Sequence, residues 1–405
     1  MYTKAEREAL DTALMTSHSV KVVVRVTDLV GNPQRDVSHM LLGGQVDVDT
    51  AGEVSRTLQV TLFDPTGTVS FDSEDPSEAA MYMNRMIEVE YGVKANSGNR
   101  WLFMPIFAGP IVSLSRNSDT IEITCFGKEH LARGVLWTNF KAKKGANKVD
   151  VIKRLMREHA GETKFDLPEL PNARLGDDFS MVALKQTPWQ GAQHLARSMD
   201  RVLYYGGDGR LRLKPARGNN VFTFRGGDAG TLMSTPNISF NAQEAKNAVI
   251  VKGKKTKEKA VVGRAVAQRT HPLSPWRLGR KVNGEIVPLY LTEVVENDSI
   301  TSKNAADVKA HNILADYLEQ QVEIAFDSLP VPYLEEYDRV KLDFESYGSQ
   351  FTLRQFSIPL TIGDTMTLGY NRRLMTIKKK KMPKRKPKDK QNNKNKRKED
   401  QMAWQ

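Results

Sequence analysis

The 405-residue chain has very little cysteine and no long apolar run, and each lack excludes a class of protein. A single cysteine, Cys125, rules out an internal disulfide framework and fits assembly in a reducing cytosol. It lies in an alternating strand pattern, which predicts a buried structural thiol. No apolar stretch approaches the roughly 20 residues that a membrane-spanning helix needs. The charged N-terminal stretch lacks the apolar core of a secretory signal and predicts a short helix within residues 1–18.

Metal-binding motifs are also missing from the sequence. The seven histidines are scattered, and none of the spacings His-Glu-x-x-His, Cys-x-x-Cys or His-x-His occurs. His159 and His194 lie on or beside apolar helix faces, which favours packing over metal ligation. We therefore expect no metal and no cofactor.

One acidic cluster, Glu335, Glu336 and Asp338, deserves comparison with the carboxylate pair of a glycoside hydrolase. Neighbouring residues of a strand point in opposite directions, so Glu335 and Glu336 are not expected to converge on one bond. A solvated entrance to a strand is the favoured interpretation. The expectation is a protein without catalytic residues.

The net charge of +12 is concentrated in one segment. Residues 378–405 contain thirteen Lys/Arg and three Asp/Glu, which leaves only +2 for the 377 residues before them. A basic domain would indicate nucleic acid as the main partner, whereas a nearly neutral body with a basic tail does not.

Residues 19–127 are predicted to form a first small β-barrel domain. Short segments of alternating polarity recur here, such as Arg56–Leu62 and Met86–Tyr91, and turn residues separate them. The long apolar segment Trp101–Leu114 is expected to bend at Pro105 and at Gly109-Pro110. This spacing of short strands is typical of a barrel or sandwich.

Residues 128–215 are predicted to form a small helix–helix–hairpin domain. Asn147 and Gly161 are the expected caps of its first helix, and Thr187 with Gln190 supplies a capping box for the second. The hairpin follows at Val202–Leu213, with its turn at Gly206-Gly207-Asp208-Gly209. Trp189 is expected to pack on this hairpin, against residues such as Val202 or Leu211.

Residues 216–377 return to strands and are predicted to form a second β-barrel domain. Asn283-Gly284 is a strong signal for a type I′ hairpin, and one helix is expected over residues 303–321. The fold class is therefore mainly β with α+β insertions, in which two small barrels flank the helix–hairpin domain.

Residues 378–405 are of low complexity and are expected to be disordered when free. This tail is the clearest binding signal, because clustered cations bind polyanions with strong salt dependence. DNA, an acidic face of a partner protein and anionic phospholipid are the candidate partners, and a mere solubility tail is the alternative. The residues proposed for this contact are Lys378, Lys379, Lys380, Lys381, Lys384, Arg385, Lys386, Lys388 and Trp404, the last as a small docking anchor.

An ordered set of weak motifs resembles the tail-tip and baseplate hub proteins of tailed bacteriophages, which are related to the hubs of contractile injection systems. The motifs are Phe107-Ala108-Gly109-Pro110-Ile111, the helix–hairpin domain ending in Tyr204-Tyr205, the strand Asn247–Val251, the helix Asn304–Gln321, and the segments Tyr337–Leu342, Phe356–Leu360 and Met366–Gly369. Their order along residues 20–375 carries the resemblance.

This resemblance implies a virion structural protein of the tail tip, assembled in the host cytoplasm. Three copies would form a ring that joins the sixfold tail tube to the tip and surrounds the channel for the tape measure and DNA. The implied partners are other copies of the chain, the distal tail and tube proteins, the tape measure protein, and tip or fibre proteins that attach to the host. Two alternatives remain: a tail-associated cell-wall hydrolase component, and a basic nucleic-acid-binding protein.

Overall fold

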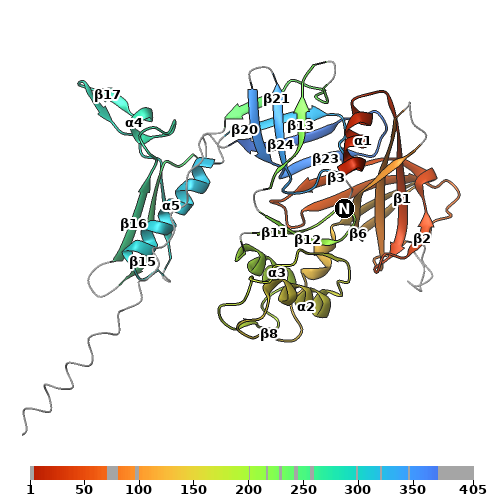
Figure 1. Ribbon diagram of the computed structural model, residues 1–405, viewed down its shortest axis with the longest axis horizontal. Coiled ribbons are helices and arrows are strands. Elements are labelled where there is room, and N and C mark those ends of the chain that lie inside the picture. The colour runs from red at the N-terminus through yellow and green to blue at the C-terminus, as the bar shows by residue number, and fades with distance from the viewer. Residues whose placement is uncertain are drawn as a thin grey trace, which may run out of the picture. The chain divides into compact units, whose positions relative to one another are not determined.

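The computed structural model describes residues 4–70, 81–95, 100–199, 201–215, 218–227, 230–240, 245–255, 260–297, 300–319, 322–344 and 347–372 (Figure 1). The chain divides into two compact units. Unit 1 comprises Met1–Ile238 and Ile324–Tyr370, and unit 2 comprises Ser239–Glu323 and Asn371–Gln405. The basic tail with its proposed binding residues, from Lys378 to Trp404, lies outside the described residues, so its disorder stays a prediction.

An 11-stranded sheet is the largest element of the fold, which confirms a mainly β protein. Its strand order is β14-β20-β24-β23-β3-β4-β7-β6-β5-β1-β2. In chain order, these strands are β1 (His18–Asp28), β2 (Pro33–Asp36), β3 (Leu41–Asp49), β4 (Arg56–Phe63), β5 (Arg85–Ala95), β6 (Leu102–Asn117), β7 (Thr120–Phe126), β14 (Asn237–Phe240), β20 (Val322–Ser328), β23 (Gln355–Pro359) and β24 (Met366–Arg372).

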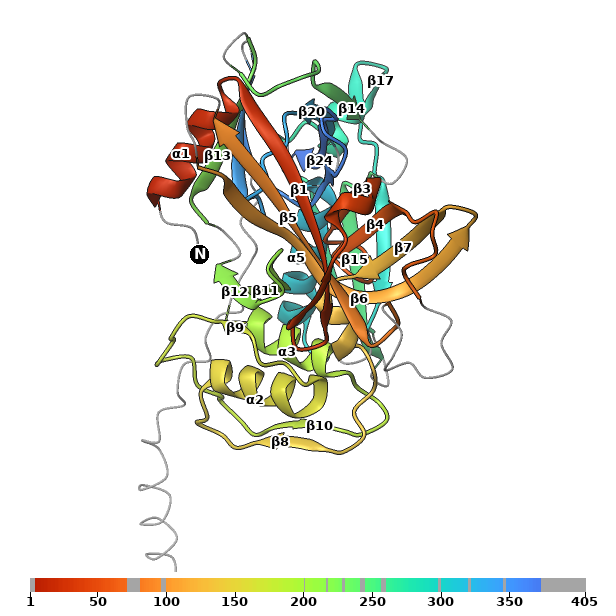
Figure 2. The same ribbon diagram turned by 90° about the vertical axis from the view of Figure 1, so that its right-hand side faces the viewer.

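The long strands β1, β5 and β6 lie side by side in Figure 2 and pair antiparallel. The register between β5 and β6 shifts where Val89 faces Phe107 and Glu90 faces Pro105. Proline cannot donate to the ladder, and a bulge bends the strand there. This confirms the bend expected at Pro105. Cys125 on β7 is buried and free, as the strand pattern predicted.

The sheet joins strands from both halves of the sequence, because β23 pairs antiparallel with β3. Residues 239–323, which lie in the middle of the predicted second barrel, instead form the larger part of unit 2. The compact units therefore divide the chain at other positions than the predicted domain limits. The arrangement as two barrels, 19–127 and 216–377, stays a prediction.

The helix–hairpin domain contains the two helices where the sequence predicted them. Its elements are the 3-10 helix Lys128–Ala132, β8 (Phe140–Ala142), α2 (Lys148–Ala160), β9 (Phe165–Asp166), β10 (Phe179–Met181), α3 (Pro188–Arg197), β11 (Arg201–Tyr205) and β12 (Leu211–Pro215). The Asn147 side chain accepts from the Val149 amide, Gly161 ends α2 in the left-handed conformation, and Thr187 and Gln190 form the capping box.

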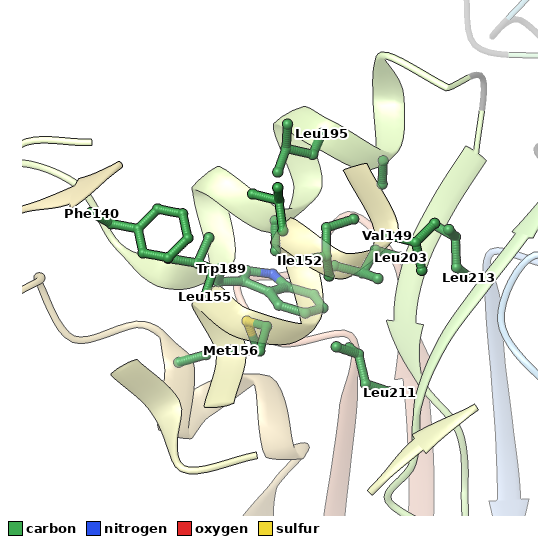
Figure 3. Packing of buried hydrophobic residues seen from close by; sticks show 14 of the residues in the cluster. Phe140, Val149, Ile152, Leu155, Met156, Trp189, Leu195, Leu203, Leu211 and Leu213 are labelled. Carbon is green, nitrogen blue, oxygen red and sulfur yellow. The ribbon is translucent and has the colours of Figure 1, made fainter. Parts of the chain in front are cut away.

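Trp189 lies in the core between these helices and the hairpin (Figure 3). It is 8% exposed and stacks on Tyr205, with ring centroids 5.7 Å apart. Leu211 belongs to the same core, as expected, whereas Val202 does not. The prediction for Val202 is wrong because side chains alternate along β11, and Leu203 and Tyr205 take the positions that face the helices.

A short helix and a three-stranded sheet complete unit 1. The helix α1 (Lys4–Leu14) falls within the predicted residues 1–18. The sheet has the order β13-β21-β22, with β13 (Asn220–Arg225), β21 (Arg339–Phe344) and β22 (Tyr347–Thr352). The Tyr333 hydroxyl donates to the Asp11 carboxylate of α1 over 2.6 Å, which ties the helix to the segment before β21.

Unit 2 is a three-stranded sheet covered by one helix. Helix α5 (Lys303–Glu319), expected at 303–321, packs on β15 and β16 as Figure 1 shows. Asn283 and Gly284 both have positive φ, 51° and 86°, which confirms the predicted type I′ turn. The elements of this unit are β15 (Ala248–Lys255), β16 (Ala260–Val266), α4 (Pro275–Leu278), β17 (Arg280–Val282), β18 (Glu285–Val287), β19 (Thr292–Glu296) and α5.

Candidate functional site: a buried ion-pair junction

A buried ion pair in unit 1 joins Arg56 to Glu336, which are 280 residues apart in the sequence. Arg56 Nε and Nη2 donate to the two Glu336 carboxylate oxygens over 3.1 and 2.7 Å. The Arg56 Nη1 donates to the carbonyl of Ile106 on β6. Both side chains are buried, 3% and 0% exposed. Burial by itself lowers the pKa of Arg56, but the charge and hydrogen bonds of Glu336, together with the charges of Glu335 and Glu129, outweigh it and the pKa is raised. The guanidinium therefore stays charged.

Glu335 joins the hairpin β11–β12 to the same segment. Its carboxylate accepts from Arg212 of β12 and from the Tyr204 hydroxyl of β11, the latter over 2.8 Å. Burial raises the pKa of Glu335, but the charges of Arg212, Lys214 and Arg56 oppose it and the pKa is lowered overall. The stability that this carboxylate contributes is therefore present near neutral pH and is lost as the pH falls through its lowered pKa.

Three further ion pairs extend this network along β12. Arg212 also contacts Asp208 over 2.6 Å and Asp166 over 3.2 Å, and Lys214 contacts Asp338 over 2.9 Å. The turn that precedes β12 fits closely against β6, since a Cβ on Gly207 would lie 2.4 Å from the Pro105 carbonyl oxygen. Only glycine fits this position without displacing backbone.

These contacts correct the interpretation of Glu335, Glu336 and Asp338 as a solvated strand entrance. Glu336 is fully buried, Glu335 and Asp338 are 20% and 15% exposed at the side chain, and each carboxylate has a cationic partner. The neighbouring carboxylates do point in opposite directions, as expected: Glu336 toward Arg56 and Glu335 toward Arg212. A carboxylate that is buried and ion-paired cannot reach a polysaccharide, so this cluster has a structural role in the described conformation.

We call these linked ion pairs, from Arg56–Glu336 to Lys214–Asp338, the junction. A third part of it lies in the 3-10 helix at 128–132. Lys128 Nζ contacts Glu162 over 2.7 Å. The neighbouring Glu129 accepts from the Ser55 amide over 2.6 Å and from its hydroxyl over 2.9 Å. The other Glu129 oxygen is buried and has no hydrogen-bond partner among the described residues. Burial raises the pKa of Glu129 even though the Ser55 contacts oppose the change.

Replacing this glutamate is expected to change how stability depends on pH. A carboxyl group whose pKa is raised by folding loses stabilising effect as the pH rises through that pKa. Glu129→Gln removes the titration, so its free energy of unfolding relative to that of the wild type should rise as the pH is raised from the ordinary glutamate pKa toward neutral pH. Denaturant unfolding over this pH range measures the difference. Glu53→Gln, at a side chain 91% exposed, is the control and should give no such trend. A difference that is constant over the range would contradict the assignment.

Sequence reasoning missed Arg56 and Arg212. For Arg56 a signal existed, because it shares the phase of Leu58, Val60 and Leu62 on β4, whose burial alternates strictly. A charged residue at an inward position predicts a buried partner. His159 is half-buried and packs edge-on against Phe140, and the exposed His194 stacks on Phe179, so both histidines contact aromatic rings as the apolar helix faces suggested. Within the described residues, no three His, Cys, Asp or Glu side chains are grouped as metal ligands.

Taken together, unit 1 is a mainly β fold with an inserted helix–hairpin domain, and buried ion pairs join distant parts of its sequence. Among solved structures, the chain is similar to the tail protein from Neisseria meningitidis MC58 at 14% identity and a TM-score of 0.56, over 86% of this chain and 96% of that one. It is also similar to the 43 kDa tail protein of prophage MuSo2 from Shewanella oneidensis at 10% identity and a TM-score of 0.59, over 88% and 99% of the two chains.

A third similar structure is the Francisella PdpA–VgrG complex, at 9% identity and a TM-score of 0.51. There 92% of this chain aligns, but only 60% of the other chain. No protein-family model matches the sequence, and no curated protein matches it. At these identities the likeness concerns the fold, and at that level it confirms the resemblance inferred from the motifs. No helix among the described residues has the length and apolar character to cross a membrane.

Proposed function

We propose that this chain is a structural hub of a phage tail tip or of a related injection apparatus. The observation that carries the proposal is the likeness to two tail proteins over 86% and 88% of this chain and nearly all of theirs. In this role three copies form a ring that joins the sixfold tail tube to the tip. The ring encloses the channel for the tape measure and DNA and sits in the virion, after assembly in the host cytoplasm.

The ion-pair junction supports a structural role over the alternative of a cell-wall hydrolase component. Its carboxylates are paired with Arg56, Arg212 and Lys214, which are drawn from distant parts of unit 1. Such a junction holds the helix–hairpin domain against the strands and keeps the shape of the subunit when it contacts neighbours. We accordingly propose a protein that works by assembly and not by catalysis.

The mass of the purified chain in solution tests this function. Light scattering should give three times the 45.5 kDa of one chain, and negative-stain images should show a ring with a central channel. A monomer over a wide concentration range, or a tail map with one or six copies, would contradict the ring. Lysis of purified cell wall by the protein would favour the hydrolase alternative.

The basic tail is expected to act as a separate binding element. Residues 378–405 carry +10, so their deletion should leave the body folded and able to form rings while its binding to DNA or anionic liposomes falls sharply. The binding of the intact protein should weaken steeply with salt. Binding curves at several salt concentrations measure both effects. If deletion changes neither binding nor assembly, the segment is a solubility tail.

Trp404→Ala separates two uses of this tail. The substitution keeps every charge, so it should leave the binding of polyanions unchanged if the tail acts by electrostatics alone. If Trp404 docks in a pocket of a tip protein, the variant should bind polyanions normally and assemble poorly.

A further inference from the structure

Residues 267–291 form an arm of unit 2, which joins the sheet strands β16 and β19. The arm contains α4 and the hairpin β17–β18, and Figure 1 shows both extending from one end of the sheet. All residues of the two hairpin strands are exposed. A two-stranded hairpin is only marginally stable by itself in water, so the conformation of the arm depends on how its base is held.

Consecutive turns hold the base of the arm, residues 267–278. The His271 amide donates to the Gln268 carbonyl over 2.9 Å, and the Ser274 amide donates to the His271 carbonyl over 2.9 Å. The Arg277 amide then donates to the Ser274 carbonyl over 2.9 Å. His271 therefore lies at the centre of the turns that lead into α4.

The His271 ring takes part in these turns as an acceptor. It is 2% exposed, and the Leu273 amide donates to its Nδ1 over 3.1 Å. Leu273 belongs to the apolar core of unit 2, so this contact joins the base of the arm to that core. A ring nitrogen that accepts carries no proton, so the neutral ring has its proton on Nε2. Protonation places a second proton on Nδ1, facing the Leu273 N–H, and the contact is lost.

The surroundings of the ring do not compensate a positive charge. His271 Nε2 is buried and has no hydrogen-bond partner among the described residues, and the same holds for the Ser274 hydroxyl three residues on. Burial lowers the pKa of His271, and the positive charge of Arg277 lowers it further. The closed arm therefore favours the neutral ring.

The carboxylates on the strands and helix of unit 2 contact other groups. Asp307 of α5 accepts from a backbone amide of β16 over 3.1 Å, and Glu293 and Glu296 of β19 pair with lysines. The other charge near the centre of these turns, Arg269, is positive and lies over the ring of Trp276. Among the described charged groups, only Arg277 has a resolved effect on the pKa of His271.

We propose that protonation of His271 opens the arm, so that residues 267–291 are held at neutral pH and released in acid. Opening here means the loss of the turns at the base. The ring, its hydrogen bond and the turns all lie within unit 2, so the inference does not depend on the proposed ring of subunits.

The sign of the pH dependence follows from the lowered pKa. Between the ordinary histidine pKa and the lowered one, the open arm binds more protons than the closed arm. The equilibrium constant for opening should therefore rise by up to about tenfold for each pH unit below about 6.5, and it should be constant above that pH.

Hydrogen exchange tests this device in the intact chain. The amides of Ser274, Arg277 and Leu289 are the reporters, since Leu289 donates to the Pro275 carbonyl of α4 over 2.9 Å. Their protection, corrected for intrinsic exchange rates, should fall about tenfold from about pH 7.5 to about pH 5.5. Amides of β15, the central strand of the sheet, should show no such change.

His271→Asn separates the ring from other titrating groups. Asparagine accepts from the amide two residues on, as His271 does, but it does not titrate. The variant should keep the same protection of the arm at both pH values. His311→Asn is the matched control, because His311 also lies in unit 2 and its Nδ1 contacts the Asp307 carbonyl on α5. It should keep the wild-type loss of protection in acid.

Three results would overturn the proposal. One is a wild-type arm whose protection does not change with pH, and another is an acid loss that persists in His271→Asn. The third comes from an NMR titration of the seven histidine rings of the wild type, which requires no substitution. One ring should titrate below the ordinary histidine pKa, and titration of all seven at or above it would show that no ring is held neutral.

The NMR titration also decides the case in which asparagine fails to hold the turn and the variant is unprotected at both pH values. A ring that titrates together with the loss of protection in the wild type then supports the proposal. A ring that titrates independently of that loss contradicts it.

Discussion

Glu336→Ala is expected to lower the free energy of unfolding by about 3–5 kcal/mol, the range for breaking a buried ion pair on one side. The substitution leaves the Arg56 guanidinium charged and 3% exposed, with the Ile106 carbonyl as its remaining partner in the contact. Because an arginine guanidinium stays protonated in proteins, the side chain cannot neutralise itself to escape the penalty. Denaturant unfolding at neutral pH measures the loss.

The double variant Arg56→Met/Glu336→Leu supplies the control for this result. A buried pair that is replaced on both sides by apolar groups often costs little, because neither charge is left without its partner. The double variant should therefore be more stable than Glu336→Ala. If the loss of unfolding free energy in the double variant equals the sum of the losses for Arg56→Met and Glu336→Leu made singly, the pair is not coupled and the proposed junction is wrong.

Trp189→Ala should cost about 3–5 kcal/mol, the usual range for truncating a large core side chain. Trp189 lies in the core between α2, α3 and the hairpin (Figure 3). Its ring stacks on that of Tyr205. Its removal opens a cavity at the centre of the helix–hairpin domain. Thermal or denaturant unfolding measures the effect, and we expect general destabilisation and not the loss of one contact.

Trp137→Ala is the control for Trp189→Ala, because the same chemical change is made at a side chain that is 87% exposed. Its free energy of unfolding should stay within about 0.5 kcal/mol of the wild type, as is usual for surface positions. An equal loss for both variants would show that the two tryptophans are not distinguished by burial.

The parts of the fold that depend on local sequence could be predicted from it. The Asn147 cap, the capping box of Thr187 and Gln190, and the turn at Asn283-Gly284 each depend on residues within a few positions of one another. The packing of Trp189 followed from the apolar face of one helix and the hairpin that comes next in the chain. Short-range chemistry determines these features, so the sequence is sufficient for them.

The junction could not be predicted, because its partners are far apart in the chain. Glu335 and Glu336 follow no pattern that points to Arg212 and Arg56, which lie 123 and 280 residues away. Charged residues at the start of a strand are usually exposed, and that general rule led to the wrong interpretation. The pairing of β23 with β3 could not be predicted for the same reason, since strand partners that are far apart in the chain leave little trace in a single sequence.

The net charge of the body concealed a second feature. A balance of +2 over residues 1–377 suggested an even charge distribution, yet residues 1–127 carry −7 and residues 128–215 carry +7. The sum therefore conceals two segments of opposite charge. Trp137 follows Val135-Leu136 in an apolar stretch, and only the core position of Leu136 shows that Trp137 is turned outward.

The place where unit 2 interrupts the main sheet has an evolutionary consequence. The chain leaves the sheet after β14 and re-enters it at β20, and these strands are neighbours. The bridge between Leu232 and Ser328 next to them is antiparallel, so the exit and the return lie at the same end of the strand pair. A segment with adjacent ends can be shortened, lengthened or exchanged without moving the strands that flank it. The main sheet therefore places little constraint on the length or sequence of the chain between β14 and β20.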